Sequence, residues 1–127
     1  MKREDKELLL KDLCARLPYG VKIYGNYSYS DGDKIVDDIQ TKTLDIYDID
    51  WVINNIEIKP YLFPLSSMTE EQKIIYGDLC YQIINATPFE IQNCFNELYD
   101  WLIKNNFDYQ GLIPMGLAID ATGLGIY

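Results

Sequence analysis

The 127-residue sequence contains no histidine. Histidine is the commonest general base near neutral pH and the commonest zinc ligand in proteins. Without it, a cysteine or serine nucleophile needs a different activating base. We therefore expect no catalytic residue, no metal site and no cofactor, and a protein that is not an enzyme.

Basic residues are also scarce. Eleven lysines and arginines stand against twenty aspartates and glutamates, which gives a net charge of −9. Affinity for phosphate comes from lysine and arginine, and in the densest basic stretch, residues 2–11, acidic residues separate the cations. We expect no binding to nucleic acid or to an anionic membrane surface.

Long hydrophobic runs are missing as well. A membrane-spanning helix needs about 20 apolar residues, whereas the longest candidate, residues 112–119, is short and contains Pro114 and Gly116. The apolar run at residues 8–10 is too short for a signal peptide. These features predict a cytoplasmic protein.

Cysteine use agrees with that location. The three cysteines form no C-x-x-C pair: Cys14, Cys80 and Cys94. In a reducing compartment such cysteines usually act as small buried apolar groups. Cys14 and Cys94 fall on the apolar stripes of predicted helices, so we expect both to be buried.

The first segment has the pattern of an amphipathic helix from about residue 4 to residue 17. Leu9, Leu13 and Leu17 recur every four residues and define one apolar stripe. Arg16 lies at the carboxyl end, where a cation interacts favourably with the helix dipole.

From residue 21 to about residue 58 the apolar period falls from 3.6 to 2. β-Branched and aromatic residues alternate with polar ones, which is typical of strands. We predict four or five short antiparallel strands, with segments near residues 21–24, 35–39, 44–46, 51–53 and 56–58.

Helices return in the second half. Thr69 and Gln72 have the spacing of a capping box, which predicts a helix to about residue 84. Thr87 as N-cap with Pro88 in the first helical position predicts another, ending near residue 105. Residues 107–127 are apolar but rich in glycine and proline, and we expect them to pack on the body.

Together these patterns predict an α+β fold. Residues 1–64 would form the N-terminal helix and a small antiparallel sheet, with a partly open small barrel as one form of it. Residues 65–127 would form a helical region and the packed tail. A chain of this length fits one compact domain.

Aspartates concentrate in the strand region: Asp31, Asp33, Asp37, Asp38, Asp45, Asp48 and Asp50. The interpretation we favour is a solvated acidic rim. The alternative is a small metal-dependent hydrolase built on this cluster. That alternative requires Asp31, Asp33, Asp48 and Asp50 to converge in one pocket.

Aromatic residues fall in the same region. Tyr24, Tyr27, Tyr29 and Trp51 are candidates for a partner-binding surface, because interfaces favour tyrosine and tryptophan. The alternative is that they close a small core. The partner would be another protein, a basic one given the charge, or a second copy of this chain.

Three longer blocks carry a resemblance. They are D-K-E-L-L-L-K-D-L-C-A-R-L-P-Y-G-V-K, I-K-P-Y-L-F-P-L-S-S-M-T-E-E-Q-K and D-W-L-I-K-N-N-F-D-Y-Q-G-L-I-P-M-G-L-A-I-D-A. Together they resemble a family of small uncharacterised proteins of gut Bacteroidetes and their phages or prophages. The resemblance implies a cytoplasmic bacterial or phage-borne setting; that family has no known activity, so no functional residue is transferred.

The leading hypothesis is a non-enzymatic interaction or accessory protein whose acidic surface engages another protein. In a mobile-element setting, an acidic protein of this size can neutralise a basic target, as toxin immunity proteins do, or mimic DNA.

Overall fold

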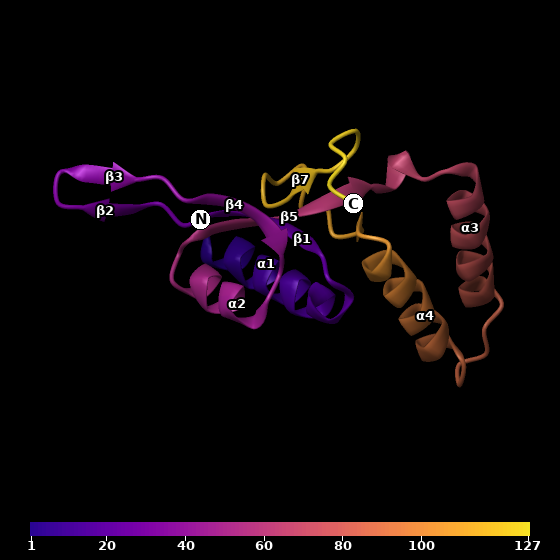
Figure 1. The fold of residues 1–127 in the computed structure, drawn as a ribbon. Coiled ribbons are helices and arrows are strands. Elements are labelled where there is room, and N and C mark those ends of the chain that lie inside the picture. The colour runs from indigo at the N-terminus through magenta and orange to yellow at the C-terminus, as the bar shows by residue number, and fades with distance from the viewer.

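A computed structural model describes residues 1–127, and its fold is α+β (Figure 1). The helices are α1 (Arg3–Arg16), α2 (Ile46–Ile53), α3 (Glu70–Ile84) and α4 (Ile91–Lys104). The strands are β1 (Lys22–Asn26), β2 (Tyr29–Asp31), β3 (Lys34–Val36), β4 (Ile39–Thr43), β5 (Glu57–Pro64), β6 (Phe107–Asp108) and β7 (Ile119–Asp120). None of the helices combines the length and apolar content that a membrane-spanning segment requires.

The central sheet is mixed and open. Its strands run in the order β4, β1, β5, β6, and β7 also pairs with β5. The β1 pairings are antiparallel, with Ile23 opposite both Lys42 and Pro60. The short strands β6 and β7 are parallel to β5, so the sheet is not wholly antiparallel and does not close into a barrel.

Helices α1 and α2 lie side by side against this sheet (Figure 1). The main core contains eleven buried residues drawn from both helices, from the sheet and from the tail: Leu9, Leu13, Val21, Ile23, Leu44, Val52, Ile58, Leu62, Leu112, Leu117 and Ala118. Residues far apart in sequence therefore share one core.

Helices α3 and α4 form a helical hairpin that extends away from the sheet (Figure 1). A second core of four buried residues lies at its base: Met68, Leu98, Leu102 and Phe107. Helix α4 packs on β6 and α1, whereas α3 contains no buried residue. The outer face of α3 is thus left without a covering layer.

The predicted strands at residues 44–46 and 51–53 are wrong, because this segment forms helix α2. A capping box starts the helix: the Asp45 carboxylate accepts from the Asp48 backbone N–H at 3.2 Å, and the Asp48 carboxylate accepts from the Asp45 N–H at 2.9 Å. Ile46, Ile49 and Val52 also have helical spacing, a signal that the apparent alternation obscured.

The two helices predicted in the second half of the chain both form, and one of them begins later than predicted. Helix α3 starts with the predicted capping box of Thr69 and Gln72. Helix α4 begins at Ile91, because residues 87–90 close a turn in which the Glu90 N–H donates to the Thr87 carbonyl at 3.0 Å. Phe89 in that turn is 96% exposed, so no packing extends the helix toward Pro88.

Helix α1 buries the predicted Leu9 and Leu13, but two of the cysteines are not buried as expected. Cys14 is exposed, and Cys94 is only partly buried. Arg16 is fully buried, as is Asp12, and their side chains form an ion pair at 2.8 Å. Arg16 also donates to the Phe107 carbonyl at 2.6 Å, which joins α1 to β6.

Candidate partner-binding site

A hollow of about 350 Å³ lies between helix α2 and the chain where β2 begins and β4 starts. Four aromatic residues line it, together with two carboxylates, one amide and one lysine: Tyr27, Tyr29, Tyr47, Trp51, Asp38, Asp48, Gln40 and Lys42. A smaller hollow adjoins it, shares Tyr47 and Trp51, and adds Asp50 and Asn54. We call the surface formed by these ten residues the aromatic-acidic face.

Tyr27 forms the base of the larger hollow. Its ring lies directly over Gly25, where an added Cβ would come within 2.4 Å of the ring. The ring meets Trp51 edge-on, with centroids 5.8 Å apart. Its hydroxyl donates to the Asp48 carboxylate at 2.5 Å. Glycine in β1 thus lets a tyrosine side chain connect the sheet to α2.

Asp48 is almost fully buried yet has several partners. Its carboxylate accepts hydrogen bonds from the Tyr27 hydroxyl and the Asp45 backbone N–H, and it forms an ion pair with the Lys42 ammonium at 3.2 Å. Lys42 also pairs with Asp45 at 2.8 Å. These contacts hold the base of the hollow in one geometry before any partner arrives.

Local charge affects the ionisation of these groups. The hydrogen bond from Lys42 keeps the pKa of Asp45 below its usual range, and the same bond raises the pKa of Lys42. Burial raises the pKa of the Tyr27 phenol, and the nearby carboxylates of Asp48, Asp45 and Asp38 raise it further. The electrostatic potential at the Tyr27 hydroxyl is therefore negative.

The rim of the face presents aromatic surface to solvent. Tyr29 is 57% exposed, Tyr47 73% and Trp51 47%. Around them, residues 27–54 contain seven aspartates and two lysines, a net charge of −5 out of −9 for the whole chain. The exposed aromatic residues thus lie in the stretch of chain that carries more than half of the excess negative charge.

The structure brings together three of the four predicted binding residues. Tyr27, Tyr29 and Trp51 line the same hollow. Tyr24 does not, because it alternates with the buried Ile23 and faces the other side of β1, where it pairs with Thr41 and Lys59. Tyr47 was missed: in a strand it had no reason to lie beside Trp51, whereas a helix places residues four apart on one face.

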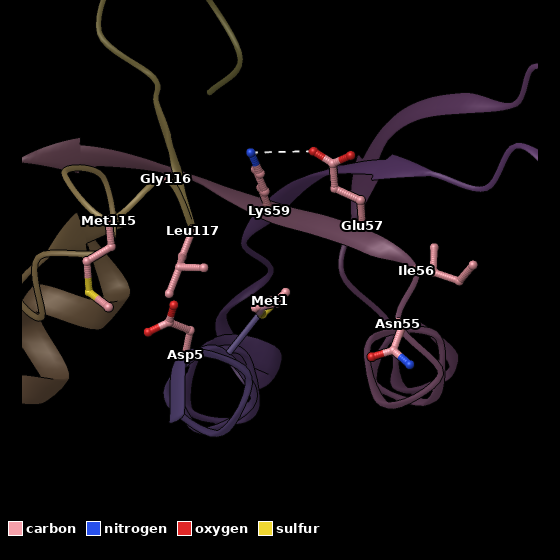
Figure 2. A pocket seen from close by; sticks show the side chains of 9 residues that line it. All are labelled: Met1, Asp5, Asn55, Ile56, Glu57, Lys59, Met115, Gly116 and Leu117. Atoms are coloured by element: carbon pink, nitrogen blue, oxygen red, sulfur yellow. Dashed lines mark ion pairs between the residues drawn. The ribbon is translucent and has the colours of Figure 1, made fainter. Parts of the chain in front are cut away.

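A second hollow, of about 420 Å³, lies where the start of α1, β5 and the C-terminal tail meet (Figure 2). Met1, Met115 and Leu117 supply apolar surface to this hollow. Asp5 of α1 lines it as well and supplies a carboxylate. Lys59 pairs with Glu57 along β5 at 3.4 Å, as Figure 2 shows. With its cation paired and no exposed aromatic residue, this hollow offers few groups that could recognise a ligand.

The aspartates do not converge as a hydrolase would require. Asp31 and Asp33 lie exposed in the β2–β3 hairpin, Asp48 is buried beneath Tyr27, and Asp50 lies on the far side of Trp51. No three cysteine, aspartate or glutamate side chains group closely enough to hold a metal ion. These four aspartates therefore do not share the single pocket that the hydrolase alternative requires.

Comparison with protein-family models, with curated proteins and with solved structures finds no match to this chain.

Proposed function

We propose that this protein is a non-enzymatic interaction protein of the cytoplasm whose aromatic-acidic face binds a basic protein. The observation that carries the proposal is the hollow in which Tyr27, Tyr29, Tyr47 and Trp51 surround paired carboxylates. Aromatic side chains dominate interface energetics because they bury large areas at low entropic cost. The surrounding aspartates supply charge complementarity to a basic partner.

The charge distribution supports a fast and selective encounter. The aromatic-acidic face contains three aspartates and one lysine, a net charge of −2, and it attracts a basic protein over distances comparable with the Debye length, about 8 Å at physiological salt. The same face repels acidic proteins and nucleic acid. The hydrogen bonds that fix Tyr27 and Asp48 reduce the ordering cost of binding.

The resemblance to proteins of Bacteroidetes and their phages supports a more specific form of this role. In that setting the basic target would be a toxin, which this protein neutralises, or a DNA-binding protein, which it blocks by presenting negative charge.

The proposal is tested with a defined basic probe, a 20-residue peptide composed of arginine, lysine, glycine and serine. NMR chemical-shift mapping of the ¹⁵N-labelled protein should show shifts centred on residues 27–54, with affinity falling steeply between about 50 and 200 mM salt. Truncating the exposed rings in the double variant Tyr29→Ala/Tyr47→Ala should weaken binding about tenfold or more.

Exposed tyrosines elsewhere provide the matched control, because Tyr19→Ala/Tyr99→Ala removes the same groups outside the face. This control should bind as the wild type does. Equal weakening in both double variants, or shifts spread over every acidic side chain, would show only general charge attraction and contradict the proposal.

Self-association through helix α3 is the second candidate function. Its outer face carries Ile74, Gly77, Tyr81 and Ile84 at the three-and-four spacing of a coiled-coil seam. Antiparallel pairing of two copies centred on residue 79 places each Tyr81 ring against the partner copy's Gly77, where a Cβ would meet nothing within 4 Å. Ile74 and Ile84, 65% and 79% exposed, would then pack on each other.

Light scattering with size-exclusion chromatography tests this candidate. The wild type should show a concentration-dependent dimer, and Tyr81→Glu should remain a monomer of 14.8 kDa. A wild type that stays monomeric at millimolar concentration refutes self-association through α3 and leaves the basic-partner proposal untouched.

A further inference from the structure

We propose that the hollow between β4 and α2 seats a single arginine side chain of the basic partner. This inference rests on the proposed function and specifies the group that the aromatic-acidic face recognises. It follows from the size of the hollow, the arrangement of its rings and the charge that remains unpaired at its rim.

The hollow is large enough to admit one arginine side chain. Its volume, about 350 Å³, lies at the low end of the range of small-ligand pockets. Tyr27 closes the base, and Tyr29, Tyr47 and Trp51 supply exposed rings around the opening. A cation placed over such rings is attracted by their quadrupoles, most strongly over tryptophan.

The charges in the hollow favour a cation over an anion. Lys42 is the positive group there, and its ammonium is already held by Asp45 and Asp48. Asp38 lines the same hollow, and its carboxylate has only a Gln40 amide as hydrogen-bond donor, at 3.0 Å. Burial is the main cause of the raised pKa of Tyr27, and the carboxylates of Asp48, Asp45 and Asp38 add to it.

Arginine fits this arrangement better than lysine does. A guanidinium is planar and weakly hydrated, so it can lie flat against an aromatic ring while its N–H groups bind a carboxylate in a bidentate manner. The hollow offers both features together, with rings from Tyr47 and Trp51 and the carboxylate of Asp38. A lysine ammonium would use the charge but little of the aromatic surface.

The test uses three small probes: N-acetyl-arginine amide, N-acetyl-lysine amide and the neutral isostere N-acetyl-citrulline amide. The two indole N–H signals of the protein report directly, because Trp51 lines the hollow and Trp101 packs in the second core as an internal control. Arginine should shift the Trp51 signal with millimolar affinity, lysine more weakly and citrulline not at all.

Two charge variants locate the carboxylate that binds. Asp38→Asn removes a carboxylate from the hollow, and Asp31→Asn removes one from the exposed hairpin outside it. We expect Asp38→Asn to weaken arginine binding about three- to fivefold, the upper range for an exposed ion pair. Asp31→Asn should change it by less than about twofold.

The outcomes separate this inference from the proposed function. If the basic peptide still maps to residues 27–54 but citrulline binds as well as arginine, or Asp31→Asn weakens arginine binding as much as Asp38→Asn, the arginine seat is refuted and the wider face remains. If the peptide does not map there at all, the proposed function fails first.

Discussion

Replacing Arg16 by methionine should destabilise the protein strongly, because it leaves a buried carboxylate without its cation. Asp12 is 1% exposed, Arg16 is fully buried, and the pair spans 2.8 Å within α1. Removing one partner of a buried ion pair typically costs about 3–5 kcal/mol. Methionine keeps most of the apolar volume, so the loss reports on charge more than on a cavity.

The same helix contains the matched control. Arg3 and Glu7 form an ion pair with the same four-residue separation, but the Arg3 side chain is 91% exposed. An exposed pair of this kind contributes about 0.3–0.5 kcal/mol. Arg3→Met should therefore leave stability almost unchanged, and the difference between the two variants isolates the effect of burial.

Urea unfolding followed by circular dichroism measures both variants. A loss of 3–5 kcal/mol corresponds to a Tm lower by about 10–20 °C in a domain of this size. If Arg16→Met is too unstable to measure, the double variant Asp12→Leu/Arg16→Met remains testable. It should recover to within about 1–2 kcal/mol of the wild type, because replacing a whole buried pair by apolar residues is often neutral.

The pH dependence provides a separate check. Burial raises the pKa of Asp12, although Arg16 acts in the opposite direction. The Asp12 carboxyl therefore binds its proton more tightly in the folded state than in the unfolded chain. The stability that the protonated carboxyl provides is lost as pH rises through the folded-state pKa. Without Arg16 the pKa of Asp12 rises further, so the loss of stability in Arg16→Met should become smaller as pH falls from about 7 toward 4.

An Arg16→Met variant as stable as Arg3→Met at neutral pH would refute the argument that the buried carboxylate needs its cation.

Three further predictions concern a crowded glycine, an open glycine and a hydrogen-bonded phenol. Gly25→Ala should lower stability by about 1–3 kcal/mol and shift the fluorescence of Trp51, because the new Cβ displaces the Tyr27 ring; unchanged unfolding and fluorescence would contradict the close contact. Gly77→Ala should raise stability by up to about 1 kcal/mol in the same assay, because the site is an open helix position; a loss would show that its Cβ meets an obstacle. Burial raises the pKa of Tyr127 to about 12, so the wild type should lose stability between pH 10 and 12 as the phenol ionises more easily in the unfolded chain. Tyr127→Phe should reduce that slope, as measured by urea unfolding at stepped alkaline pH, and an unaltered slope would contradict the assignment.

The amino-acid sequence by itself determined the local elements whose signals lie within a few residues. The leucine spacing of α1 and the Thr69–Gln72 capping box of α3 were sufficient, because helix periodicity and capping depend on neighbouring residues. Sequence also located the stretch of chain that carries aromatic residues and excess acid, since composition needs no coordinates.

Helix α2 shows where local reasoning failed. Residues 46–53 contain β-branched and aromatic residues that favour strands, but a capping box of two aspartates and burial of Val52 against the sheet selected a helix. Propensity is a weak prior, and packing overrides it. The error mattered because only a helix places Tyr47 beside Trp51.

Only the tertiary structure decided which side chains meet. Arg16 looked like a surface cation at a helix end, yet contact with Asp12 and the Phe107 carbonyl buries it. Tyr24 and Tyr27 looked equivalent, yet Tyr27 contacts Asp48 and Trp51 on α2, whereas Tyr24 lies outside that hollow. Such contacts join residues up to 91 positions apart, and periodicity within a short window contains no information about them.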